Sequence, residues 1–141
     1  MLCVNTYGHD SIDHCRARVA SYVDAYRAMT AGAADDAATA AFEPVFFNNL
    51  VLALDTYFTH RSRTLEGKDG NPLNEVRLLC ASLTQNDGLM VADKGIRLRP
   101  DASVLGYAPD DEIALTEVGF VRLADAYFDE MQARFGAPVA A

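Results

Sequence analysis

The chain has 141 residues, of which 50% are hydrophobic and 23% are charged, and its net charge is -8. This composition excludes a disordered protein, because there are enough apolar side chains to form a core. The acidic balance argues against a nucleic-acid binder and against a protein that binds membrane surfaces, since both need basic surfaces. The length predicts a single domain that spans residues 1–141.

Neither a membrane helix nor export is expected from the sequence. The most apolar stretch, Val45–Phe58, contains two Asn and one Asp and is shorter than the roughly 20 apolar residues of a membrane span. The N-terminus lacks the basic start and apolar run of a secretory signal. The three cysteines form no Cys-x-x-Cys pair, and their odd number argues against a disulfide framework. These features predict a cytoplasmic protein with reduced thiols.

Two helices are predicted in the N-terminal half. The first covers Ser11–Met29, where apolar residues recur at spacings of three and four, and Asp10 or Ser11 is its expected cap. The Ala-rich segment that follows predicts a break and a short helical lead-in. The second helix is predicted from Pro44, in its first turn, to Leu65. At about 30 Å it is expected to be the central helix of the domain.

A strong stop and restart signal precedes the third helix. Gly67 is expected to end the second helix in the left-handed conformation. Asn71 is the expected cap of the third helix, with Pro72 at its first position and its end near Gln85. So short a connection predicts an antiparallel helical hairpin.

The C-terminal part changes character. Residues 95–100 and 112–116 alternate apolar with other side chains, which predicts two short strands, with an irregular loop as the alternative. The last helix is predicted to start near Thr116, its cap, and to end at Gly136 and Pro138. The expected fold is mainly α: a compact antiparallel four-helix bundle with a short β-hairpin or extended arm between the third and fourth helices.

The densest polar cluster lies at the corner between the second and third helices. Side chains that converge there beside the free N–H groups of a helix N-terminus would suit a phosphate or carboxylate. The alternative is a structural corner whose charges pair with one another. Arg61 falls on an apolar face and is expected to be buried and paired with an acid, Glu75 being the nearest. The candidate ligand-binding residues are His60, Arg61, Arg63, Lys68, Asn74, Glu75 and Arg77.

The distribution of apolar residues on the last helix predicts self-association. Its apolar arc is wider than the roughly 100° that packing on one side of a bundle requires. Either the arm or another copy of the chain is expected to cover the surplus, the simplest assembly being a two-fold homodimer. The candidate interface residues are Phe120, Leu123 and Tyr127.

Three blocks of the chain, Phe47–Leu52, Tyr57–Arg61 and Gly67–Arg77, carry a resemblance. They are similar to a group of small actinobacterial proteins described only as hypothetical. The resemblance covers most of the chain and implies no activity, substrate or site residues.

No catalytic residues, cofactor or metal are predicted. The sequence has no Gly-x-Ser-x-Gly, no phosphate-binding glycine loop and no zinc-ligand spacing. It therefore favours an acidic, non-enzymatic cytoplasmic protein that acts by self-association or by binding a protein partner. The alternative is a binding protein or enzyme for a small anionic ligand, using the corner His60–Arg77.

Overall fold

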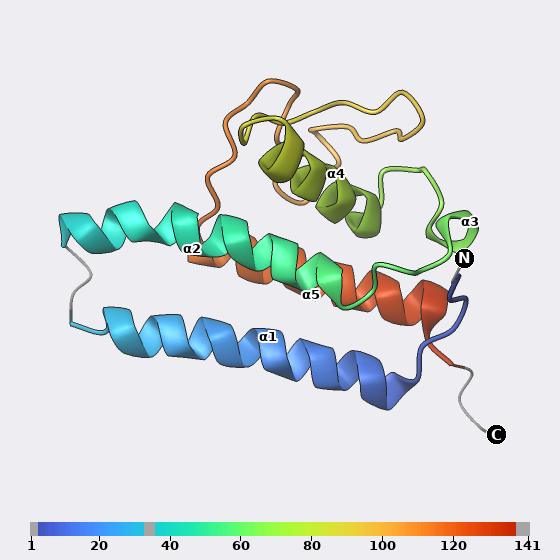
Figure 1. Cartoon of the computed structure of the whole chain (residues 1–141), viewed down its shortest axis with the longest axis horizontal. Helices are drawn as coiled ribbons and strands as arrows, with labels where there is room; N and C mark the ends of the chain where they lie inside the picture. Colours follow the sequence, from blue (N-terminus) through green and yellow to red (C-terminus); the bar gives the residue numbers. More distant parts are fainter. Residues whose placement is uncertain (1–2, 33–35, 138–141) are drawn as a thin grey trace.

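The structure, a computed structural model, describes residues 3–32 and 36–137 and is mainly helical, as predicted. Figure 1 shows α1 (His9–Thr30), α2 (Ala37–Thr56) and α5 (Glu117–Phe135) side by side, with α4 (Pro72–Gln85) and the loop that follows it on the side away from α1. α5 contacts each of the other helices, so it takes the central place that the sequence assigned to the second helix. The remaining helix, α3 (Arg63–Glu66), lies between α2 and α4 in the chain.

α1 begins two residues before its predicted start. Gly8 is its N-cap residue, without a side-chain hydrogen bond, so the caps predicted at Asp10 and Ser11 are wrong. The helix ends at Thr30, where the sequence predicts a break. Residues 33–35 within that break lie outside the described residues.

α2 begins earlier and ends earlier than predicted. Asp36 caps it, and the Ala-rich lead-in is its first part, since Ala is the best helix former. Pro44 therefore lies inside the helix and not in its first turn. α2 ends at Thr56, and the chain beyond it pairs with Val4, whose N–H donates to the His60 carbonyl at 2.7 Å. The predicted end at Leu65 is wrong, and that side chain is 40% exposed.

α4 has the bounds that the sequence predicts. The Asn71 side chain accepts hydrogen bonds from the N–H groups of Leu73 and Asn74, and Pro72 occupies the first turn. Asn71 also donates to the Glu66 carbonyl at 2.7 Å, which ties the start of α4 to the end of α3. The connection from α2 to α4 is longer than a simple hairpin turn, because α3 lies within it.

Replacing Asn71 by Ala is expected to lower the free energy of unfolding by about 1–2 kcal/mol. The substitution removes the cap of α4 and one of the two side-chain donors to the Glu66 carbonyl, the other being Arg134. A urea titration of both proteins measures the difference. Unchanged stability would contradict the assignment of Asn71 as a cap.

The two strands predicted near residues 95–100 and 112–116 are absent from the described part of the chain. Among the described residues, the one β-bridge that involves this segment is antiparallel and joins Leu89 to Glu112. Ile96 and Ile113 are nevertheless buried, so the segment is an irregular arm that covers α4. The mainly α fold is therefore confirmed without the β-hairpin.

The side chains predicted as a dimer interface belong to the core of one chain. Phe120, Leu123 and Tyr127 are each 0% exposed. Phe120 packs on Phe47 of α2 with ring centroids 5.5 Å apart. The wide apolar arc of α5 has a simple cause, since α5 is covered on several sides by helices of its own chain. Val118 of the same helix is 68% exposed.

α2 is the one described helix that is long and apolar enough to cross a membrane, by length and composition. Of its most apolar window, 22% is buried in the protein. The core helix of a soluble protein meets the same criterion. The expectation that the chain does not enter a membrane therefore stays a prediction.

Candidate functional site

The polar corner is built around a buried carboxylate, Glu66, which is 0% exposed. It accepts hydrogen bonds from Arg61 Nε at 2.8 Å, Arg77 Nη2 at 2.6 Å and Asn74 Nδ2 at 2.8 Å. Burial acts to raise the pKa of Glu66, but Arg77 and Arg61 hold that pKa below its usual value. The corner is thus a closed ion pair network.

Arg61 is buried, as predicted, and it bridges two acids. Besides Glu66, its Nη1 donates to Asp55 of α2 at 2.8 Å. The same nitrogen lies 3.1 Å from the Phe58 carbonyl and 3.4 Å from the hydroxyl of Tyr127 on α5. The guanidinium therefore joins the end of α2 to α3 and α5. The prediction of Glu75 as its partner is wrong.

Glu75 has a separate role. Its carboxylate accepts hydrogen bonds from the backbone N–H groups of Val104 and Leu105, at 2.8 and 2.9 Å. Burial raises the pKa of Glu75, and the two backbone donors oppose that shift. This side chain anchors the arm between α4 and α5.

The structure brings together only three of the predicted ligand-binding residues: Arg61, Asn74 and Arg77. Each of these three already donates to Glu66. His60, Arg63 and Lys68 are exposed and take no part in this network. The arrangement matches the structural alternative, in which the charges of the corner pair with one another.

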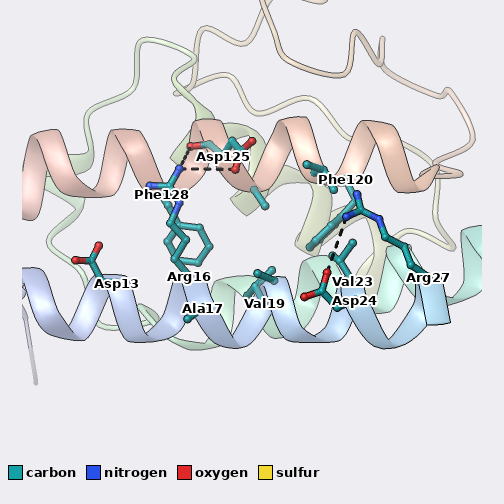
Figure 2. Close-up of a pocket in the computed structure, with 13 residues that line it drawn as sticks. Asp13, Arg16, Ala17, Val19, Val23, Asp24, Arg27, Phe120, Asp125 and Phe128 are labelled. Carbon is teal, nitrogen blue, oxygen red and sulfur yellow. Dashed lines mark hydrogen bonds and ion pairs between the residues drawn. The ribbon is translucent and has the colours of Figure 1, made fainter. Parts of the chain in front are cut away.

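A groove with a volume of about 440 Å³ lies between α1 and α5. Figure 2 shows side chains from both helices pointing into it, with charged groups toward its ends. The lining residues are Asp13, Arg16, Ala17, Val19, Ala20, Val23, Asp24, Arg27, Phe120, Val121, Ala124, Asp125 and Phe128.

Ion pairs stand at both ends of the groove. At one end Arg16 Nη2 lies 2.9 Å from Asp129 Oδ1, and it also faces Asp125. At the other end Arg27 Nε lies 3.0 Å from Glu117 Oε2. Exposed pairs of this kind each contribute under about 1 kcal/mol to stability. They place the two arginines beside acids of α5 at the ends of the groove.

The floor of the groove is apolar and not filled by the chain itself. Ala17 and Ala20 of α1 are exposed, and Val121 of α5 is half-buried. No group of three or more metal-ligating side chains is placed together in the described ranges. The groove thus offers apolar contact between charged ends.

Sequence reasoning missed the groove. Alanines on α1 give no periodic apolar signal, and the charged residues between them read as an ordinary solvated face. The available signal was the placement of Asp13, Arg16, Asp24 and Arg27 at spacings that bring them to one side of a helix.

No protein family, curated protein or solved structure matches the chain, so the resemblance to hypothetical actinobacterial proteins stays a prediction.

Proposed function

We propose that this protein is a non-enzymatic cytoplasmic protein that acts by binding a helix of a protein partner in the groove between α1 and α5. The observation that carries the proposal is the unfilled apolar floor of the groove, with charged side chains toward its two ends. Amphipathic helices bind such grooves through apolar side chains on one face.

The dimensions suit a helix. Asp13 and Arg27 mark the two ends of the lining on α1, and the distance between them along the helix is about 21 Å. That length accommodates about four turns of a docked helix. A helix seated there would pack against both α1 and α5.

A small ligand fits the observations less well. Small-molecule sites combine an apolar enclosure with a few polar groups that converge inside it. Here the arginines of the rim face acids at the ends of the groove. At the other candidate site, the corner His60–Arg77, the donors that an anion would need already bind Glu66. The groove is therefore the better supported site.

Photo-crosslinking tests the proposal. A photoreactive amino acid replaces Ala20, which is exposed in the groove, in protein produced in its native host. The matched control carries it at Thr84, which is exposed on α4. A protein adduct of discrete mass, mapped to a helical segment of the partner, is expected from Ala20 and not from Thr84. Equal labelling from the two positions, or none, would overturn the proposal.

A further inference from the structure

The charges that α1 places along the groove have an antisymmetric order about Ala20. Asp13 and Arg27 lie seven residues to either side of it, and Arg16 and Asp24 lie four residues to either side. All four side chains line the groove. Reversing the direction of the helix therefore exchanges every acid for a base.

A helix with this order is complementary to itself when two copies run antiparallel. With a two-fold axis at Ala20, Asp13 faces the partner's Arg27 and Arg16 faces the partner's Asp24. The symmetry repeats each pair, so the contact contains four opposite-charge pairs. A parallel, in-register contact would instead place like charges opposite one another, which disfavours association.

We propose that the occupant of the groove is a second copy of this chain, with the two α1 helices antiparallel about a two-fold axis at Ala20. This inference rests on the proposed function and names its partner. The two copies of α1 and α5 then form an antiparallel four-helix bundle across the interface. Two-fold homodimers are the commonest assemblies of soluble proteins.

The surface permits such a contact. Ala17 and Ala20 are exposed and small, so the two helices can approach to the distance of about 8–10 Å at which helices pack. Val121 of α5 extends the apolar floor beside them. The contact thus combines apolar burial at the axis with charge pairs at its ends.

Arg16 and Arg27 can each bind a second carboxylate. Arg16 and Arg27 are each held by a carboxylate of α5, at 2.9 and 3.0 Å. A guanidinium has five N–H donors, so each can bind a further carboxylate without losing the first. Asp13 takes part in none of the ion pairs among the described residues, and Asp24 faces Arg27 only at 3.9 Å.

Two complementary double variants test this arrangement. One carries Asp13→Arg and Asp24→Arg, which makes positions 13, 16, 24 and 27 of α1 all basic. The other carries Arg16→Asp and Arg27→Asp, which makes them acidic. Light scattering after size exclusion, at tens of micromolar, is expected to give the wild type twice the 15.3 kDa chain mass. Each variant alone is expected to dimerise about 30-fold or more weakly, and an equimolar mixture is expected to restore a heterodimer.

The variant Asp101→Arg is the control for exchanging an Asp for an Arg outside the groove, because Asp101 is exposed on the arm. It is expected to dimerise as the wild type does. Circular dichroism checks that each variant is folded. Ala20→Glu is a further variant: it sets two carboxylates together at the axis and keeps the α1–α5 ion pairs. If the acidic variant fails to fold, loss of the dimer in Ala20→Glu and in the basic variant, but not in Asp101→Arg, still supports the inference.

The remaining outcomes would overturn the homodimer, and one of them would do so without overturning helix binding in the groove. A monomeric wild type, or a dimer that the basic variant and Ala20→Glu leave intact, overturns it. So does a mixture of two folded variants that stays monomeric. An adduct from Ala20 to a different protein would overturn it as well, yet retain helix binding in the groove.

Discussion

Replacing Arg61 by Met is expected to lower the free energy of unfolding by about 3–5 kcal/mol, because it breaks a buried ion pair network from one side. The guanidinium is fully buried and lies 2.8 Å from both Asp55 and Glu66. Methionine fills much of the same volume but leaves Asp55 without a cation and Glu66 with Arg77 as its remaining one. A denaturant titration at neutral pH measures the loss.

Arg63→Met is the matched control, since Arg63 lies two residues away and is exposed. Its effect is expected to stay within about 0.5 kcal/mol. Arg61→Lys is expected to recover only part of the stability, because one ammonium cannot reproduce the separate contacts of Nε and Nη1. If Arg61→Met costs no more than Arg63→Met, the network contributes no net stability.

The sequence was sufficient to predict the burial of Arg61 but not its partner. Burial followed from its place among apolar residues. The partner depended on where α2 ends, because residues 61 and 66 would point about 140° apart on a continuous helix. The break after Thr56 and the cap at Ser62 turn Glu66 back toward Arg61. The segment after that break pairs with Val4, which lies far away in the sequence.

The failed strand prediction has a similar cause. The alternation at residues 96–98 is present as burial: Ile96 is buried, Arg97 exposed and Leu98 half-buried. A strand also needs a neighbour for its backbone, and here the Arg97 N–H donates to the Lys68 carbonyl in a loop. Gly70 permits this approach, since a Cβ there would collide with the Arg97 carbonyl oxygen. Periodicity reports burial, whereas sheet formation depends on distant segments.

The charged side of α1 could be read from the sequence, whereas the apolar floor of the groove could not, for a geometric reason. That floor depends on how far α1 lies from α5, and no local pattern encodes that distance. The helix bounds of α4 and its cap at Asn71 were predictable because they depend on neighbouring residues alone. The candidate site could be recognised only after tertiary packing placed the two helices side by side (Figure 2).

Leu123→Lys is expected to unfold the protein and not merely to separate a dimer. Leu123 is 0% exposed, so the lysine must either keep its charge at a large desolvation cost or lose its proton. Substitutions of this kind cost more than about 4 kcal/mol, a large share of the 5–15 kcal/mol that stabilises a typical domain. Thermal unfolding followed by circular dichroism measures the change.

Val118→Lys is the matched control on the same helix. Val118 is 68% exposed, so the same side chain is expected to change stability by less than about 0.5 kcal/mol there. A folded, monomeric Leu123→Lys protein with the melting temperature of Val118→Lys would contradict the burial of Leu123. It would favour the interface that the sequence predicts on this face of α5. If Leu123→Lys unfolds and Val118→Lys does not, the apolar arc of α5 reflects the central position of that helix in its own chain. The groove then remains the place where a partner helix can bind.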